Sequence, residues 1–351
     1  MQQTFHKVGM IAFGQRGQQL AETIINELPE YASIVAVADL RKNPIPSPLI
    51  SFRCPDTVYV TDYRELLQIP EIDSVIISTY EDTHLQICKD AINAGKAVYC
   101  EKPVVPDLSD AQAFYQFVTS RECYFQIGLN LPNFPVPLKL RELLDKKVIG
   151  RLIMVRAACD VGQRFARNFL LNKFSCKRGN FITAKLTHDT DLLQNLTDSY
   201  AEEVWGKTTN NMWRRHGQEA MTDDTALICG VMHNGVMFTQ SLTSCGAKYE
   251  RKMHFFGTDG EIIADLHGEE VNVVYGNGQK ECIPAPNLTG GGHRGADVLI
   301  LRSFFDYIDS AIPQARQPER ILSSVMIPMA AMSGQHVKTG EWYRKYLKID
   351  R

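Results

Sequence analysis

The sequence lacks the features that mark several large classes of protein. It has no apolar stretch long enough to span a membrane, and the polar residues 1–5 show no signal-peptide pattern. Its nine cysteines form no C-x-x-C pair and no metal-finger spacing, so we expect reduced thiols, no metal site and a cytoplasmic protein. The net charge of −2 gives no indication of a nucleic-acid or acidic-lipid partner.

The composition that remains is typical of a globular protein with substantial cores. Hydrophobic residues make up 44% of the chain and charged residues 22%. A length of 351 residues favours two domains over one. The sequence contains no internal repeat and no low-complexity segment, so we expect two ordinary compact domains.

A glycine turn near the N-terminus is the most informative local pattern. An apolar run at 8–13 leads through Gly14 and Gly17 into a helix-like segment at 18–28. Strand, glycine turn and helix in this order are typical of a dinucleotide fingerprint, in which backbone N–H groups at the helix start face a pyrophosphate. Ala12 stands where the first glycine is usual, so the turn either avoids a positive φ there or is slightly strained. The candidate cofactor contacts in this turn are Ala12, Phe13, Gly14, Gln15, Arg16 and Gly17.

An acidic residue follows the second predicted strand. Residues 32–38 form an apolar run that ends at Asp39, about 20 residues beyond the glycines, where a ribose 2′-hydroxyl is held in such folds. A solvated strand end is the alternative. Asp39 would repel a 2′-phosphate, which favours NAD, although Arg41 could bind such a phosphate or stack on adenine, and NADP stays possible.

Strands and helices alternate along the first part of the chain. We expect strands at 58–60, 72–79, 97–100 and 124–128, and helices at 62–67, 83–94 and 107–118. This alternation predicts a doubly wound parallel sheet. We therefore expect a dinucleotide-binding Rossmann domain over residues 1–128.

The regular alternation of strands and helices ends near residue 129. Helices are expected at 138–145, 188–196, 296–311 and 320–334, and strands at 152–158, 203–206, 225–229, 235–243, 252–256, 261–265 and 271–275. Glycine-containing turns separate several of these strands, as in antiparallel sheets. We expect an α+β domain over residues 129–351 with a large, open, mostly antiparallel sheet.

Two segments lie where ligands bind in a doubly wound sheet, at the carboxyl ends of strands. Residues 79–84 follow the fourth strand, and Glu101-Lys102-Pro103 follow the fifth. A crevice lysine such as Lys102 can donate a hydrogen bond to a hydroxyl or carbonyl oxygen and stabilise alkoxide character. An ordinary surface loop is the alternative.

A second candidate group lies on the helix near residue 188. Lys185, His188 and Asp189 fall on one side of it. His188 could take a hydroxyl proton, because imidazole titrates near neutral pH, and Asp191 could orient a charge. An ordinary polar helix turn is the alternative. The cationic segment 162–180 and the glycine run before His293 and Arg294 could each reach a cleft or be plain solvated connections.

Together these segments resemble the Gfo/Idh/MocA family, the glucose–fructose oxidoreductase and inositol dehydrogenase group. The motifs are the glycine turn at 12–17, Ala38-Asp39, T-Y-E-D-T-H at 79–84, A-G-K-A-V-Y-C-E-K-P at 94–103, I-G-R-L at 149–152 and H-D-T-D-L-L at 188–193. The resemblance implies NAD(P) with its nicotinamide near Lys102, a sugar, cyclitol or similar polyol as substrate, and Lys102 and His188 as catalytic pair.

The same resemblance adds further expectations. Lys185 matches a family variant with lysine three residues before the histidine, and we include it among the catalytic residues. The sheet domain is expected to form a homo-oligomer, as a dimer or tetramer. The further candidate cofactor contacts are Ser78, Thr79, Tyr80, His84, Glu101, Lys102 and Asn130.

Three functions are compatible with these residues. The first is an NAD(P)-dependent oxidoreductase acting on a carbohydrate-like alcohol. The second is a non-catalytic nucleotide-binding sensor, suggested by Ala12 and by Ala184 at a position where the family often has aspartate. The third is an enzyme that keeps NAD tightly bound and oxidises its substrate transiently.

Overall fold

The computed structural model describes residues 4–41, 48–105, 107–167, 180–212, 222–310 and 317–347. The chain divides into two compact units. The first comprises Met1–Val105, Ser109–Asn133 and Leu288–Ile321, and the second comprises Pro106–Leu108, Phe134–Asn287 and Leu322–Arg351. Contacts therefore group Leu288–Ile321 with the N-terminal part of the chain. A division of the chain at a single position, residue 129, does not include this return of the chain to the first unit. The assignment of roles to residues 1–128 and 129–351 stays a prediction.

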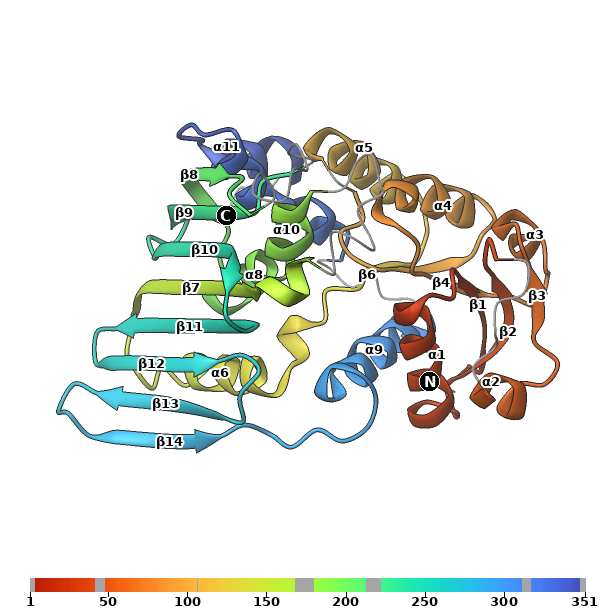
Figure 1. The fold of residues 1–351 in the computed structure, drawn as a ribbon, viewed down its shortest axis with the longest axis horizontal. Coiled ribbons are helices and arrows are strands. Elements are labelled where there is room, and N and C mark those ends of the chain that lie inside the picture. Colours follow the sequence, from red (N-terminus) through yellow and green to blue (C-terminus); the bar gives the residue numbers. More distant parts are fainter. Residues whose placement is uncertain are drawn as a thin grey trace. The chain divides into compact units, whose positions relative to one another are not determined.

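A parallel six-stranded sheet, in the order β3-β2-β1-β4-β5-β6, forms the centre of the first unit (Figure 1). Its strands are β1 (His6–Ile11), β2 (Ala32–Ala38), β3 (Val58–Val60), β4 (Ser74–Ile77), β5 (Ala97–Cys100) and β6 (Phe125–Ile127). The strand order reverses between β1 and β4, which is the arrangement of a doubly wound sheet. The predicted fold class of this part is confirmed.

Helices connect these strands. They are α1 (Gln15–Glu27), α2 (Pro48–Arg53), α3 (Tyr63–Leu67), α4 (Glu81–Asn93) and α5 (Leu108–Thr119), with a short 3₁₀ turn η1 (Leu131–Asn133) after β6. The side chain of Asp62 caps α3 by accepting the N–H of Arg64, and Gly95 follows the end of α4 with φ +73°. Helix α1 begins three residues before the predicted start, because Gly14 itself is the N-cap.

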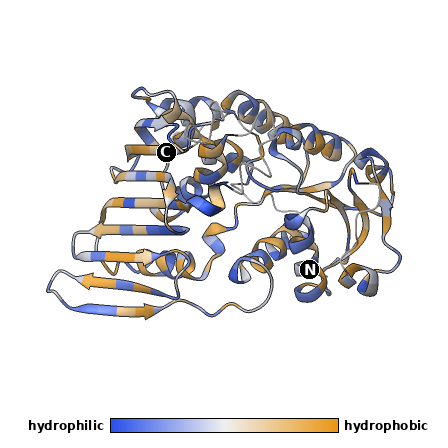
Figure 2. Ribbon diagram, in the orientation of Figure 1, coloured by the Kyte–Doolittle hydropathy of each residue, from blue (hydrophilic) through white to orange (hydrophobic). Residues whose placement is uncertain are grey.

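The core of the first unit needs a helix from the far end of the sequence. Helix α9 (Ala296–Ser310), preceded by the short turn η3 (His293–Gly295), buries Phe304 and Phe305 in one cluster with Val8 of β1 and Leu20 of α1. Figure 2 shows hydrophobic residues concentrated along the strands of this sheet. Each large apolar side chain buried in this way stabilises the fold by about 1.5–3 kcal/mol.

An eight-stranded sheet dominates the second unit, in the order β14-β13-β12-β11-β7-β10-β9-β8 (Figure 1). Its strands are β7 (Leu152–Gly162), β8 (Ala201–Thr209), β9 (Thr225–Met232), β10 (Met237–Gly246), β11 (Glu250–Gly257), β12 (Gly260–Asp265), β13 (Glu270–Tyr275) and β14 (Lys280–Pro284). All neighbours are antiparallel except β7 and β10. The predicted open, mostly antiparallel sheet is confirmed.

Helices pack on this sheet, and alternate residues point away from them. The helices are α6 (Pro135–Asp145), α8 (Phe181–Thr197), α10 (Gln317–Met332) and α11 (Thr339–Trp342), followed by the π-helical turn η4 (Tyr343–Leu347). Helix α8 packs against β7 and β10. The strands alternate hydrophobic and polar residues, as Figure 2 shows, so one set of side chains faces the helices.

Two findings concern the part of the chain that the structure describes. No helix there is long and apolar enough to cross a membrane. Its eight cysteines are all free thiols.

Candidate functional site

The glycine turn places the N-terminus of α1 at the carboxyl edge of the parallel sheet. Gly14 is the N-cap residue, and no side chain caps the first turn of α1. A Cβ atom at Gly14 would meet nothing within 4 Å, whereas one at Gly17 would lie 2.5 Å from the carbonyl oxygen of Ala12. Gly17 is therefore required by packing, and Gly14 leaves the first N–H groups of the helix accessible. This arrangement fits a pyrophosphate, because those N–H groups and the helix dipole favour an anion.

Ala12 adopts the strained conformation that its sequence position left open. Its φ is +69°, in the left-handed region that glycine adopts most easily. Its N–H donates to the carbonyl of Ala38 (2.8 Å), and its own carbonyl accepts the hydroxyl of Ser78 (3.0 Å). These contacts hold Ala12 between β2 and the end of β4.

Asp39 and Arg41 form a tight pair beside the turn. The carboxylate of Asp39 accepts the N–H of Phe13 (2.7 Å) and three N–H groups of Arg41, from the backbone (3.0 Å), Nε (2.8 Å) and Nη2 (2.9 Å). Hydrogen bonds from the Arg41 side chain lower the pKa of Asp39 to about 2, so the carboxyl group is ionised. A ribose hydroxyl on Asp39 would compete with Arg41, whose side chain is 57% exposed and also donates from Nη2 to the carbonyl of Phe13 (2.7 Å).

His84 joins the two segments expected to line the crevice. It is buried, with Nδ1 2.8 Å from the carbonyl oxygen of Pro103 and Nε2 3.0 Å from that of Thr79. Burial lowers the pKa of His84, which favours a neutral ring with a single N–H to donate. The ring therefore lies between the turns after β4 and β5 and donates a hydrogen bond to one of the two carbonyl oxygens. Tyr80, the N-cap residue of α4, is exposed.

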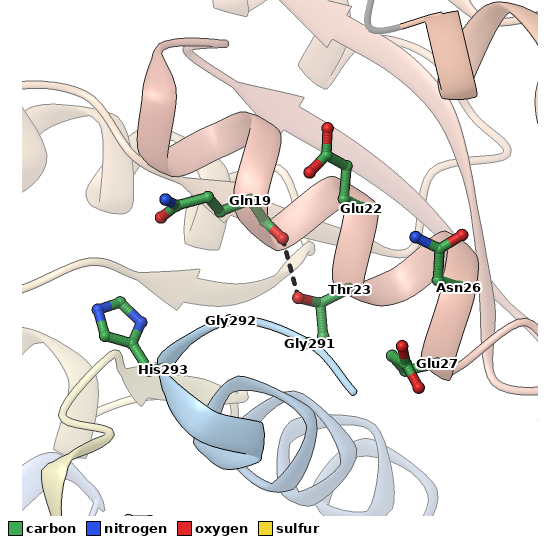
Figure 3. A pocket seen from close by; sticks show the side chains of 8 residues that line it. All are labelled: Gln19, Glu22, Thr23, Asn26, Glu27, Gly291, Gly292 and His293. Atoms are coloured by element: carbon green, nitrogen blue, oxygen red, sulfur yellow. Dashed lines mark hydrogen bonds between the residues drawn. The ribbon is translucent and has the colours of Figure 1, made fainter. Parts of the chain in front are cut away.

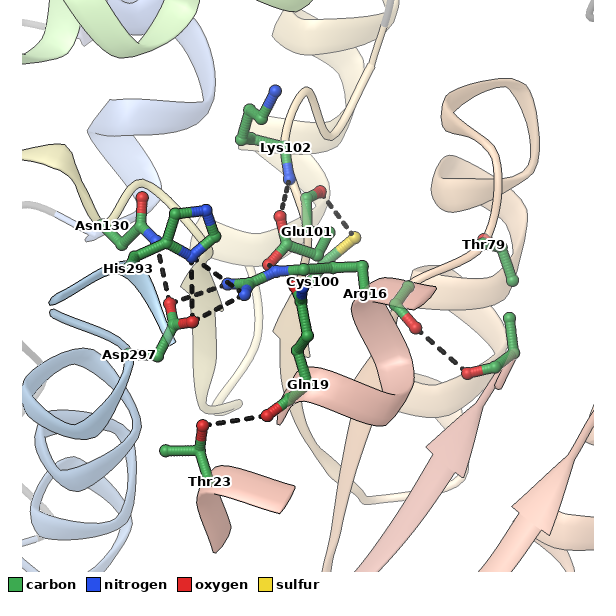
Figure 4. Close-up of polar contacts among 12 residues, drawn as sticks. Arg16, Gln19, Thr23, Thr79, Cys100, Glu101, Lys102, Asn130, His293 and Asp297 are labelled. Carbon is green, nitrogen blue, oxygen red and sulfur yellow. Dashed lines mark hydrogen bonds and ion pairs between the residues drawn. The ribbon is translucent and has the colours of Figure 1, made fainter. Parts of the chain in front are cut away.

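A charge network around the buried carboxylates of Glu101 and Asp297 connects the glycine turn with three other segments (Figure 4). Arg16 donates from Nε to Glu101 (2.8 Å) and from both Nη atoms to Asp297 (2.6 and 2.8 Å). Asn130 donates to Asp297 (2.8 Å), and Nδ1 of His293 lies 2.9 Å from the same carboxylate. The network therefore joins α1, the end of β5, the segment after β6 and the start of α9.

The charges in this network stabilise one another. Burial alone would lower the pKa of Arg16, but the carboxylates of Glu101 and Asp297 raise it well above its usual range. Burial would raise the pKa of Asp297, but hydrogen bonds from Arg16 and His293 hold it far below its usual value. Asp297 was not among the residues predicted from the sequence, and it lies 281 positions from Arg16.

The glycine run before α9 packs against α1 and brings His293 to Asp297. A Cβ at Gly291 would lie 2.7 Å from Val298 and 3.1 Å from Thr23. A pocket of about 450 Å³ opens between this run and α1 (Figure 3). It is lined by Gln19, Glu22, Thr23, Asn26, Glu27, Gly291, Gly292 and His293. None of the predicted cofactor contacts lines it, so we assign it no role.

The second unit holds the other candidate residues on α8. Asn180 caps this helix by accepting the N–H of Ile182, and Lys185 is buried with Nζ 4.4 Å from the ring centre of Phe165. Of the predicted cationic segment 162–180, residues 163–167 are helical, and 168–179 lie outside the described residues.

Arg251 of β11 fastens this part of α8 to the sheet. Its Nε lies 3.3 Å from Oδ1 of Asp189, and its Nη2 donates to the carbonyl of Lys185 (3.4 Å). Burial would lower the pKa of Arg251, but the charge of Asp189 raises it above its usual range. The backbone carbonyl of Lys185 and the carboxylate of Asp189 thus contact the same arginine of β11, and His188 lies between the two residues in sequence. Arg251 was not predicted, since nothing in its local sequence marks it.

The predicted catalytic residues are distributed over both units. Lys102 follows β5 in the first unit, where its backbone N–H donates to Glu101 (3.3 Å), and Lys185 and His188 belong to α8 in the second unit. The pairing of Lys102 with His188 stays a prediction.

Comparison with known proteins identifies the family. Residues 6–129 match the oxidoreductase family with an NAD-binding Rossmann fold, GFO/IDH/MocA, and residues 138–263 match the GFO/IDH/MocA C-terminal domain. The chain is 23% identical over 301 residues to an inositol 2-dehydrogenase/D-chiro-inositol 3-dehydrogenase of Shouchella clausii, covering 84% of this chain and 77% of that relative.

Two solved structures share the fold. A levoglucosan dehydrogenase in complex with NADH and levoglucosan superposes with a TM-score of 0.82 at 18% identity, covering 95% of this chain and 99% of the other. The scyllo-inositol dehydrogenase from Lactobacillus casei with bound NAD(H) and scyllo-inositol gives 0.75 at 20% identity, with the same coverage. The chain therefore belongs to the Gfo/Idh/MocA family of oxidoreductases and carries that family's NAD-binding Rossmann domain.

Proposed function

We propose that this oxidoreductase transfers hydride between NAD and a hydroxyl group of a sugar, cyclitol or related polyol. The observation that carries the proposal is the uncapped N-terminus of α1 at the same sheet edge as the Glu101–Lys102 turn. Relatives and fold neighbours named for inositols and levoglucosan support a polyhydroxylated substrate. When bound, NAD supplies the hydride acceptor.

Different residues of the first unit would bind different parts of NAD. The N–H groups after Gly14 would bind the pyrophosphate, and Asp39 would accept a ribose hydroxyl once Arg41 turns aside. The ionised Asp39 supports NAD over NADP, because it opposes a 2′-phosphate.

Three residues would act on the substrate. Lys102 would donate a hydrogen bond to the reacting oxygen, and His188 would take the hydroxyl proton. Lys185 would assist from the turn of α8 before His188. The carbonyl of Lys185 bonds to Arg251, which keeps that turn in place.

Removing the Lys102 ammonium tests the proposal. Polyols and sugar acids are screened with NAD by following NADH fluorescence, for the wild-type protein and Lys102→Ala, with the exposed Lys280→Ala of β14 as control. We expect Lys102→Ala to lower turnover of the best substrate by at least about 100-fold, the usual size of an acid–base contribution. NAD affinity, measured by calorimetry, should stay within about threefold. Retention of full turnover by Lys102→Ala would contradict the assigned role.

Two alternatives lead to other results in the same experiment. A sensor function is favoured by Ala184, which is 2% exposed and leaves no acid at that position of α8. It predicts NAD binding with no turnover of any compound in the panel. An enzyme with tightly bound NAD would release the cofactor on denaturation of the purified protein and would show no net NADH formation.

We also propose that two copies associate through the open face of the second sheet. On that face Trp205, Cys229 and Thr239 lie in one row across β8, β9 and β10. Leu227 and Met237 belong to the same face and are 67% and 54% exposed. Contiguous exposed apolar side chains of this kind are typical of a covered interface, and a second copy is the occupant that the family resemblance implies.

A cytoplasmic location is a further proposal. The eight cysteines in the described ranges are free thiols, including the exposed Cys229, Cys245 and Cys282. Thiols persist in a reducing compartment, whereas secreted proteins usually oxidise them.

A further inference from the structure

We propose that Arg16 and Asp297 are positioning residues, which hold the glycine turn and the Glu101–Lys102 turn in fixed register, and that Arg16 does not bind the cofactor phosphate. The inference rests on NAD being held at the glycine turn, and it is independent of which substrate is oxidised. It changes the expectation for Arg16, whose place in the fingerprint alone suggests contact with the pyrophosphate.

The guanidinium group of Arg16 is fully engaged by carboxylates. All three nitrogen atoms of Arg16 donate to carboxylates, Nε to Glu101 and both Nη atoms to Asp297 (Figure 4). A bidentate pair of this kind is fixed in direction as well as in distance. Turning the side chain toward a phosphate would break three charge-assisted bonds to form new ones.

The carboxylate of Asp297 is buried and needs the positive charge of Arg16. Its side chain is 0% exposed, so it gains nothing from water, and Asn130 and His293 complete its contacts. A buried carboxylate that loses its cation is strongly unfavourable. Asp297 therefore retains Arg16, and no atom of the Arg16 side chain lies within 4 Å of a Cβ placed at Gly14.

Glu101 links Arg16 to Lys102, because its two carboxylate oxygens accept hydrogen bonds from these two residues. One carboxylate oxygen accepts Nε of Arg16 (2.8 Å), and the other accepts the backbone N–H of Lys102 (3.3 Å). A shift of Arg16 would thus move the backbone that presents Lys102. The network sets the position of the lysine relative to the N–H groups that would bind the pyrophosphate.

The test uses substitutions for which the two roles predict opposite signs. Asp297→Asn keeps the shape of the side chain but releases Arg16 from its charged partner. If Arg16 were a phosphate ligand, this release would leave NAD affinity unchanged or raise it. If it positions the turn, we expect NAD⁺ and NADH to bind about tenfold more weakly, by calorimetry of the full-length protein.

Arg16→Lys decides the question even where Asp297→Asn fails to fold, which circular dichroism would reveal. Lysine keeps the charge for a phosphate but cannot bridge Glu101 and Asp297, so positioning predicts the same loss of about tenfold as for Arg16→Gln. The double variant Arg16→Gln/Asp297→Asn should bind NAD no more weakly than either single variant, within about twofold. Glu22→Gln, an exposed carboxylate on α1, serves as control and should bind NAD normally.

Each outcome has a defined meaning. Weaker binding by Asp297→Asn and Arg16→Lys, with a non-additive double variant, supports the inference. Unchanged or tighter binding by Asp297→Asn or by Arg16→Lys overturns it and leaves the proposed function intact. Failure of the wild-type protein to bind NAD⁺ or NADH would overturn both.

Discussion

Ala12 occupies a position in the glycine turn where a left-handed backbone is needed. A non-glycine residue in that region costs about 1–2 kcal/mol, and the site retains the strain because Ala38 and Ser78 hold the backbone by hydrogen bonds. Glycine would relieve the strain but would also lose more backbone entropy on folding. The first effect is the larger one.

We therefore expect Ala12→Gly to raise the free energy of unfolding by about 0.5–1 kcal/mol, measured by urea denaturation. Ala113→Gly is the matched control. Ala113 is exposed within α5, where glycine lowers stability by about 1 kcal/mol. Equal destabilisation by both substitutions would show that the positive φ of Ala12 stores no strain.

Among individual residues, those in local motifs could be identified as candidates from the sequence, whereas their distant partners could not. Gly14, Gly17, Asp39 and Lys102 could be recognised because each belongs to a short pattern with a known backbone requirement. Asp297 could not, since only folding brings it to Arg16. Long-range ion pairs leave no periodic signal in a single sequence.

A buried ion pair between Asp189 and Arg251 joins helix α8 to strand β11. Asp189 and Arg251 are both buried, and their closest atoms are 3.3 Å apart. Removing one partner of such a pair leaves an uncompensated charge, whereas replacing both with apolar residues does not.

Accordingly, we expect Asp189→Leu or Arg251→Met alone to lower the free energy of unfolding by about 3–5 kcal/mol. The double variant should lose clearly less than the sum of the single losses, in a cycle measured by chemical denaturation. Additive losses would instead show that the two charges do not stabilise each other.

Elements with a strong apolar pattern were predicted closely, and polar or proline-flanked ones were not. Strands β2, β3 and β5 have the predicted bounds, because each is a short apolar run between turn signals. Strand β14 was missed, since its side chains are mostly exposed and lack a buried face. Helix α2 was missed because it begins at Pro48, which reads as part of a loop.

At the scale of the whole molecule, the proposed association of two copies through the open face of the second sheet can be tested with one substitution. Leu227→Asp would place a charge in the proposed interface, so we expect the oligomer to dissociate toward monomers at micromolar concentration, measured by light scattering during size-exclusion chromatography. Leu40→Asp is the control, since Leu40 is 92% exposed in the first unit and lies off that sheet. An unchanged mass for Leu227→Asp would exclude this face as the interface.

The return of α9 to the N-terminal sheet has a consequence for biosynthesis. Phe304 and Phe305 complete the core around Val8 and Leu20, yet a ribosome adds them only after the whole second sheet has been translated. A nascent chain that already contains every strand of the parallel sheet therefore still exposes an apolar surface to solvent. Chaperone engagement is expected to last until residues near 310 have emerged from the exit tunnel.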